Sequence, residues 1–117
     1  TEVFDTIQSV FDRGYDFLVT PTLSIPPVKN KIDSYTTGPA EVNGEAVDQH
    51  IGWCLTYPIN FSGHPAASVP IGMTKNDLPV GYQIIGPKFA DDLVLAASQV
   101  LEEQQPWMDN YRKIDLS

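Results

Sequence analysis

The feature that most constrains the fold is a set of glycines and prolines placed inside apolar segments in the second half of the chain. They lie in two stretches, Pro58–Gly72 (PINFSGHPAASVPIG) and Leu78–Gly86 (LPVGYQIIG). Proline fixes φ and lacks a backbone N–H, whereas glycine enters positive φ without steric cost. Such residues at fixed places specify one backbone path, which amphipathic patterning alone does not. We therefore interpret most of these positions as scaffold: tight exits, strand ends and sites of close packing.

Two strands are predicted within this region. Ala66–Ile71 and Val80–Ile85 are apolar and are joined by a polar connection, Thr74–Asp77, which favours an antiparallel pair. Pro70 cannot donate a hydrogen bond to a neighbouring strand, so it indicates an edge position or a bulge. Gly81, inside the second strand, indicates close approach by another part of the chain.

Apolar residues recur at helical spacing in three longer segments. These predicted helices span Val3–Phe11, Glu41–Leu55 with its secure part from Glu45, and Phe89–Gln104, whose apolar stripe is Phe89, Leu93, Ala96, Ala97, Val100 and Leu101. Gly14 and Pro106 follow the first and last of them as stop signals. A short helical turn is also predicted, capped by Thr56, beginning at Tyr57 and Pro58 and ended by Gly63.

The region between the first two helices divides into a strand and a loop. Tyr15–Thr20 contains three consecutive apolar residues, which predicts a central strand buried on both faces. Thr22–Ala40 is rich in proline and polar residues and has no periodicity. We expect it to form a long ordered surface loop, and loops of that length in a compact domain are usually functional.

The order of these elements favours an α/β fold with a mixed sheet covered by helices, in a single piece spanning residues 1–117. The strands are few, so the sheet is expected to be incomplete and to need a partner at its edge. That partner is either another part of the same protein or a second copy in a homodimer. The chain begins at Thr1 inside a predicted helix, so we expect it to be a segment of a longer polypeptide.

Composition excludes several classes of partner. The chain is 42% hydrophobic and 19% charged, which is typical of globular proteins, and its net charge is −8. Binding to nucleic acid needs clustered lysine and arginine, and the seven basic residues here are scattered. Cys54 is the single cysteine, which is typical of a reducing compartment, so we expect a cytoplasmic location. No stretch approaches the roughly 20 apolar residues of a membrane span.

Other catalytic motifs fit the sequence poorly. His50, His64 and Asp48 lack the G-x-S-x-G turn that presents a serine nucleophile. Two histidines and Cys54 are too few for a zinc site, and the glycines are too widely spaced to bind a phosphate, so no metal or cofactor is predicted. Thr1 is interpreted as a helix N-cap rather than as an N-terminal threonine nucleophile.

Three stretches, in this order, resemble the amidase signature family. They are Tyr15–Thr22 (YDFLVTPT), Tyr57–Gly72 (YPINFSGHPAASVPIG) and Leu78–Gly86 (LPVGYQIIG), the last followed by a helix with Asp91 at its start. Together they extend through most of residues 3–105. The resemblance implies the C-terminal part of the family's α/β/α fold, within an enzyme that hydrolyses a carboxylic amide to a carboxylate and ammonia or an amine.

The resemblance also implies that the catalytic groups lie outside this chain. Members of the family use a serine nucleophile, a second serine in a cis peptide and a lysine. These residues belong to a Gly-Gly-Ser-Ser type stretch and an upstream lysine, and neither occurs here. The five lysines are interpreted as solvated. We therefore predict no catalytic residue in this chain, no amidase activity of the chain alone, and the missing N-terminal part of the enzyme as its partner.

By position, the resemblance implies that this segment forms the far wall of a pocket for a small-molecule amide. The substrate-binding candidates are Thr22, Trp53, Tyr57 and Asn60. The A subunits of tRNA-dependent amidotransferases have an aspartate near the position of Trp53, which grips the amino group of glutamine. An aromatic ring cannot supply that charge, which favours a hydrolase of apolar or aryl amides. Trp53 as a core anchor is an equally open interpretation.

Two alternative functions stay open from the sequence. One is a non-catalytic structural or binding module, which associates with a separate N-terminal half. The other is the A subunit of a tRNA-dependent amidotransferase. An open reading frame that extends several hundred residues upstream and contains the Gly-Gly-Ser-Ser stretch and its lysine would separate an enzyme from a module.

Overall fold

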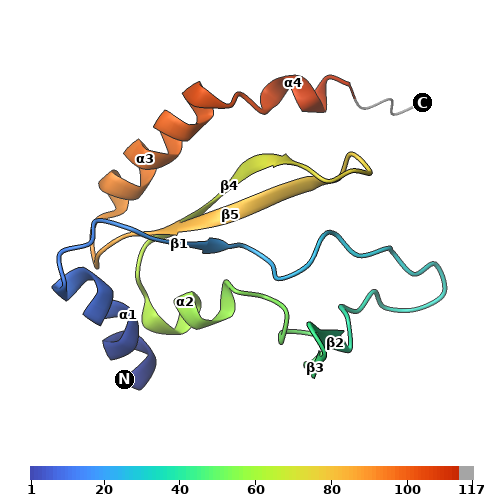
Figure 1. The fold of residues 1–117 in the computed structure, drawn as a ribbon, viewed down its shortest axis with the longest axis horizontal. Helices are drawn as coiled ribbons and strands as arrows, with labels where there is room; N and C mark the ends of the chain where they lie inside the picture. The colour runs from blue at the N-terminus through green and yellow to red at the C-terminus, as the bar shows by residue number, and fades with distance from the viewer. Residues whose placement is uncertain (114–117) are drawn as a thin grey trace.

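The computed structural model describes residues 1–113 and is built around one three-stranded sheet. The strands are β1 (Leu18–Pro21), β4 (Ala66–Met73) and β5 (Pro79–Ile85), in the order β1-β5-β4. Both pairs are antiparallel, so the mixed sheet predicted from the sequence is not seen within the described residues. Helices cover both faces, which confirms the α/β class (Figure 1).

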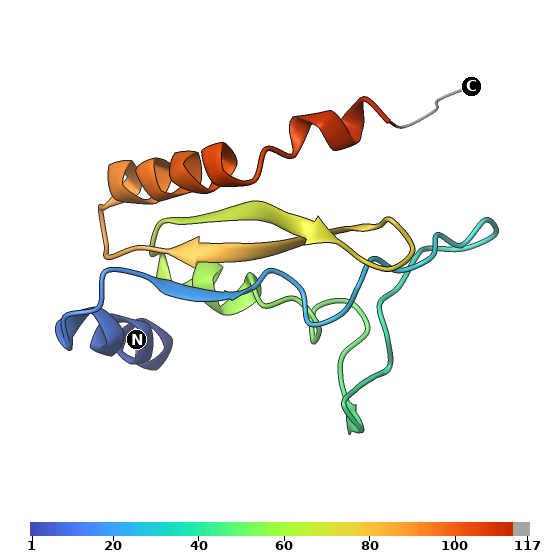
Figure 2. The ribbon, with the colours of Figure 1, turned by 45° about the horizontal axis from the view of Figure 1, so that its top comes forward.

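The two faces of the sheet carry different helices. Helices α1 (Glu2–Asp12) and α2 (Tyr57–Ser62) pack together on one side, whereas α3 (Asp91–Gln104) lies against β4 and β5 on the other (Figure 2). The short helix α4 (Met108–Tyr111) follows α3. The chain therefore forms three layers, with the sheet in the middle.

Side chains alternate between the two faces of the sheet, so each face has its own buried core. On the α1 and α2 side, Ile85 is fully buried against Ile7 and Ile59, with Phe11 and Leu18 packed around them. On the α3 side, the buried apolar residues are Val69, Ile84 and Val94. Neighbouring residues of β5 thus serve opposite cores, which explains why this strand is apolar over both of its last residues.

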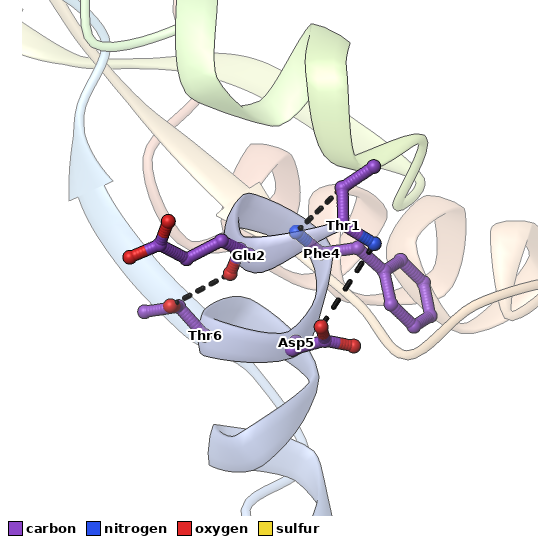
Figure 3. A network of polar contacts seen from close by, with 5 residues as sticks. All are labelled: Thr1, Glu2, Phe4, Asp5 and Thr6. Carbon is purple, nitrogen blue, oxygen red and sulfur yellow. Dashed lines mark hydrogen bonds and ion pairs between the residues drawn. The ribbon is translucent and has the colours of Figure 1, made fainter.

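The first helix begins as predicted. The hydroxyl of Thr1 accepts a hydrogen bond from the amide of Phe4 at 3.3 Å, which is the contact of an N-cap (Figure 3). Asp5 lies 3.8 Å from the amino group of Thr1, and Thr6 donates to the carbonyl of Glu2 at 2.8 Å. After the helix, Gly14 has a φ of 90°, a left-handed conformation that the predicted stop signal requires.

The strand pair of the second half is also confirmed. Ala66 pairs with Ile85, and the register shifts between Pro70 and Gly72, where the sequence predicts an edge position or a bulge. Both expectations hold, because β4 is an edge strand of this sheet. Gly63 ends α2 with a φ of 70°.

The helix predicted over Glu41–Leu55 is wrong. Residues Glu41–Val42 and Glu45–Ala46 form a small antiparallel hairpin, β2 and β3. Its two turn residues, Asn43 and Gly44, have φ values of 51° and 84°, as a type I′ turn requires. Asn-Gly is a strong hairpin signal, and it overrides the helical spacing of the apolar residues that follow it.

The first predicted strand is at an edge rather than in the centre. β1 begins at Leu18 and has one neighbour, β5, and Val19 is 55% exposed. The run of apolar residues predicts burial on both faces, but one face of β1 is open within the described residues. This agrees with the expectation of an incomplete sheet whose edge needs a partner.

Helix α3 starts later and buries another face than predicted. It begins at Asp91, because Phe89 has a positive φ of 66° and is exposed. Val94 is the buried residue, and Ala97, Ser98 and Leu101 are half-buried at the same helical spacing. The rest of the predicted stripe, including Leu93 and Val100, is exposed. The helix is therefore apolar on a second side that the described residues leave uncovered.

Membrane and metal sites find no support in the described part of the chain. No helix among residues 1–113 has the length and apolarity to cross a membrane. The same residues contain no group of three or more histidine, cysteine or acidic side chains placed to hold a metal ion.

Candidate functional site

Two segments far apart in the sequence meet beside the sheet. The long loop leaves β1 and pairs with the segment before α2 through a bridge between Leu23 and Cys54. The amide of Ser24 donates to the carbonyl of Trp53 at 3.1 Å, and the amide of Leu55 donates to the carbonyl of Thr22 at 3.2 Å. These bonds bring together Thr22 and Trp53, two of the four predicted substrate-binding residues.

A buried glutamine fixes this pairing to the sheet. Gln83 of β5 is 2% exposed, and its side-chain amide donates to the hydroxyl of Thr20 at 2.9 Å and to the carbonyl of Leu55 at 2.7 Å. One side chain thus joins β1, β5 and the segment before α2. Gln83 was not predicted from the sequence, although a lone amide inside an apolar strand is a usable signal, since buried polar groups need partners.

Close to Gln83, two hydroxyl groups from either side of the central strand β5 meet on one face of the sheet. The Oγ1 atom of Thr22 lies 2.7 Å from the Oγ atom of Ser68, above Gly81. The pair lies at a cavity of about 380 Å³ that is also lined by Leu23, Ile25 and the prolines Pro26, Pro27 and Pro79. None of the ten residues that line this cavity is charged. The cavity suits a neutral, largely apolar ligand.

Trp53 lies against the far end of the long loop. Its indole nitrogen donates to the carbonyl of Gln49 at 2.9 Å, and a Cβ atom added to Gly38 would overlap the indole ring. Two hydrogen bonds join Gly38 and Gln49. The backbone amide of Gly38 donates to the carbonyl of Gln49 at 2.8 Å, and the side-chain amide of Gln49 donates to the carbonyl of Gly38 at 3.2 Å. Trp53 therefore clamps the two ends of the loop of residues 22–40, because its carbonyl binds Ser24 and its ring packs on Gly38. Trp53 lies in irregular structure, not in the predicted helix.

The other two candidates lie on α2, and of the four predicted residues only Thr22 lines the cavity. Tyr57 packs edge-on against Phe61, with ring centroids 4.9 Å apart, and both rings are exposed. Asn60 lines a separate cavity beside His64. The structure thus joins the segments of Thr22 and Trp53 through backbone hydrogen bonds, but the Trp53 ring lies outside the cavity that Thr22 lines. Tyr57 and Asn60 lie apart from both segments.

His64 links the two helices on the α1 side. Its Nε2 atom lies 3.0 Å from the side-chain oxygen of Gln8, its Nδ1 atom lies 2.9 Å from the hydroxyl of Ser62, and its ring stacks on Phe4 at 5.0 Å. Burial, and then the nearby charge of Lys88, lower the pKa of His64. This histidine has a packing role.

A serine, histidine and aspartate triad is also absent from the geometry of the described residues. Asp48 accepts hydrogen bonds from the amides of His50 and Ile51 at 2.8 and 3.1 Å, and these bonds lower the pKa of Asp48. The carboxylate is therefore occupied by its own turn. Among residues 1–113, no lysine side chain is hydrogen-bonded to a serine; Lys31 bonds to Thr37, and Lys88 lies over Phe4 and Phe89.

The chain spans about a fifth of the length of its relatives. A solved bacterial aryl acylamidase of the amidase signature family is 51% identical, with a TM-score of 0.89 over 94% of this chain and 22% of that chain. The acylamidase of Rhodococcus erythropolis is 34% identical over 92% of this chain and 22% of its own length. The A subunit of the glutamyl-tRNA(Gln) amidotransferase of Bartonella tribocorum is 30% identical over 80% of this chain and 18% of its own length.

The family model described as amidase matches residues 1–95, which include the two paired segments, the hydroxyl pair and α2. The stretches that carried the resemblance, from Tyr15 to Gly86, all lie within this match. On these grounds the chain belongs to the amidase family, and its resemblance to amidase signature enzymes is confirmed.

Proposed function

We propose that the whole protein hydrolyses the amide bond of a neutral apolar or aryl amide, and that this chain supplies scaffold and part of the substrate-pocket wall. The observation that carries the proposal is the likeness to the bacterial aryl acylamidase, at 51% identity and a TM-score of 0.89. The uncharged cavity beside Thr22 supports it, because its proline and aliphatic walls suit an apolar substrate.

The wall acts by orienting the substrate, since the nucleophile is expected upstream. Water adds the elements of OH to the acyl carbon and H to the leaving nitrogen, so the products are a carboxylate and an amine. Thr22 lines this cavity, and we assign Trp53 to the wall through the loop that its carbonyl and its ring hold. Orientation of the scissile bond contributes to rate by reducing the entropy lost on reaching the transition state.

The partner of this segment is the upstream part of the same protein. Large apolar side chains are exposed on both sides of the sheet, on β1, α2 and α3; they include Val19, Phe61, Leu93, Leu95 and Val100. Exposed apolar surface of this extent marks an interaction surface. The chain's coverage of about 22% of the acylamidases is the further support for a larger whole.

The second candidate is the A subunit of a glutamyl-tRNA(Gln) amidotransferase. It is favoured by relatives of that description, one of which, from Nocardia farcinica, is 42% identical over 70% of this chain and 16% of its own length. Trp53 argues against it, because the resemblance places there the aspartate that holds the amino group of glutamine. The absence of any charge among the lining residues of the cavity argues the same way.

The test is an assay of the full-length protein with acetanilide and with glutamine. We expect aniline to be released from the anilide, and no glutaminase activity. Ammonia release from glutamine without anilide turnover would favour the amidotransferase instead. The 117-residue chain, purified alone, is expected to be inactive on both substrates. Turnover by the chain alone that is lost when one of its own serines is replaced would contradict that expectation.

A further inference from the structure

The hydroxyl pair formed by Thr22 and Ser68 lies over a glycine of the central strand, Gly81. Ser68 is on β4, and Thr22 directly follows β1, so they flank the central strand β5 on either side. Residues two strands apart are separated by about 10 Å, which is too far for direct contact over an ordinary side chain. Their oxygens nevertheless approach to 2.7 Å, over Gly81 of the strand between them.

Gly81 has little room for anything larger. A Cβ atom at this position would lie 3.2 Å from the hydroxyl of Ser68 and from the carbonyl of Val69, and 3.5 Å from the hydroxyl of Thr22. The amide of Thr22 also donates to the carbonyl of Gly81 at 3.3 Å. The backbone of Gly81 therefore holds Thr22 beside β5, and its lack of a side chain leaves the space next to the two hydroxyls open.

The hydrogen-bonding capacity of the pair is only partly used. Two hydroxyl groups hold two protons and four lone pairs. Within residues 1–113, the only side-chain hydrogen bond of either residue is the one between them. One O–H is thereby engaged, and one O–H and several lone pairs are left for a ligand in the cavity. Such a pair can donate to one ligand atom and accept from another.

The remaining walls define the chemical class of the ligand. Proline and aliphatic side chains form the sides of the cavity, and its lining residues carry no charge. Among the described residues the cavity offers no counter-ion to a charged group, whereas a flat apolar body has prolines and Ile25 to contact. The cavity thus combines apolar walls with one hydrogen-bonding point.

We propose that the Thr22–Ser68 pair binds a neutral hydrogen-bonding substituent of the amide substrate, such as a hydroxyl or carbonyl group remote from the scissile bond. Ser68 is then a specificity-determining residue, and Gly81 keeps it accessible. This inference deepens the proposed function and rests on it. The substrate class becomes a small aryl or apolar amide that carries one neutral polar substituent.

The test uses the full-length protein and two matched pairs of anilides. In one pair a hydroxyl replaces a methyl on the ring, and in the other the same exchange is made on the acyl chain. A site built to hydrogen-bond a hydroxyl discriminates against the analogue that lacks it. We expect wild-type kcat/KM to favour the hydroxyl member of one pair, and Ser68→Ala to reduce this preference about tenfold.

Two further variants keep the result decisive. Thr22→Val removes the other hydroxyl at nearly equal volume and is expected to reduce the same preference. Ser98→Ala removes a hydroxyl that bonds the carbonyl of Val94 on α3, away from the cavity, and should leave the preference unchanged. An unchanged preference in both Ser68→Ala and Thr22→Val, or an equal loss in Ser98→Ala, overturns the proposal.

A direct binding measurement separates this inference from the proposed function. If no anilide is hydrolysed, the proposed function fails, and titration calorimetry then compares the hydroxyl and methyl anilides on wild type and Ser68→Ala. A hydroxyl preference that is lost in Ser68→Ala supports the site on its own. Equal binding of both members by wild type overturns it.

Discussion

The sheet and the long loop of this chain are held by different means. Strands β4 and β5 are joined by a ladder, and Ile84 and Ile85 are buried on its two faces. Residues 22–40 run away from the sheet with almost no secondary structure, and Ile32 and Tyr35 near the loop tip are 98% and 94% exposed (Figure 1). The loop is held at its ends by a few long-range contacts. The sheet scaffold therefore depends on many hydrogen bonds and packing contacts. The candidate pocket wall, which is the loop of residues 22–40 with its contacts to Trp53 and Ser68, depends on a small number of side chains.

The largest expected effect is on the scaffold. Ile85→Ala removes a fully buried side chain that contacts Ile7 and Ile59, so it should destabilise the full-length protein by about 2–5 kcal/mol. Urea unfolding would measure the loss. Ile32→Ala, at an exposed position in the loop, is the matched control and should change stability by less than about 0.5 kcal/mol. Equal losses in both variants would erase the distinction between the two regions.

The next effect concerns the loop. Gly38→Ala introduces a methyl group where the indole of Trp53 lies, so the ring must move and the loop must loosen, at a cost of about 1–3 kcal/mol that is confined to the loop and leaves the buried core unchanged. Faster proteolysis within residues 22–40 and altered fluorescence of Trp53 in a Trp107→Phe background would report the change. Ser34→Ala, at an exposed position of the same loop, is the control. A cleavage rate equal to that of the control would mean that the clamp does not hold the loop.

A smaller effect involves His64, where α1 meets α2. Its pKa is lowered in the folded state, so the unfolded chain takes up a proton first as the pH falls below about 6.5. The stability that this histidine contributes is complete above that pH and decreases as the pH falls toward the folded pKa. The midpoint of urea unfolding between pH 8 and pH 5 should fall less in His64→Gln than in wild type. A His64→Gln profile that matches wild type would contradict this account.

Local signals in the sequence predict much of the scaffold. The cap at Thr1, the stop at Gly63, the hairpin of β4 and β5 and the irregularity at Pro70 each depend on the chemistry of one or two residues, and all are confirmed. The predicted start of α3 is wrong because Phe89 is apolar at the right spacing but has a positive φ. Periodicity carries no information about a single backbone angle.

Much less of the candidate pocket wall could be predicted from the sequence. The bond between Thr22 and Ser68 joins residues 46 positions apart, and that from Gln83 to Thr20 joins residues 63 apart. Asn43-Gly44 forms a hairpin turn instead of the weak start of a helix, so the helical setting predicted for Trp53 is wrong. Neither pattern nor spacing predicts which loop residues meet across a sheet, since that depends on the register of three strands together.

The most direct test of the wall is Trp53→Ala in the full-length protein, assayed on an anilide and followed by thermal unfolding. A rise in KM without loss of kcat indicates lost substrate binding. We expect KM to rise about tenfold or more, while the melting temperature changes little, because Trp53 lies at the loop and outside the buried core. A large fall in melting temperature with an unchanged KM would contradict the account and make Trp53 a structural anchor alone.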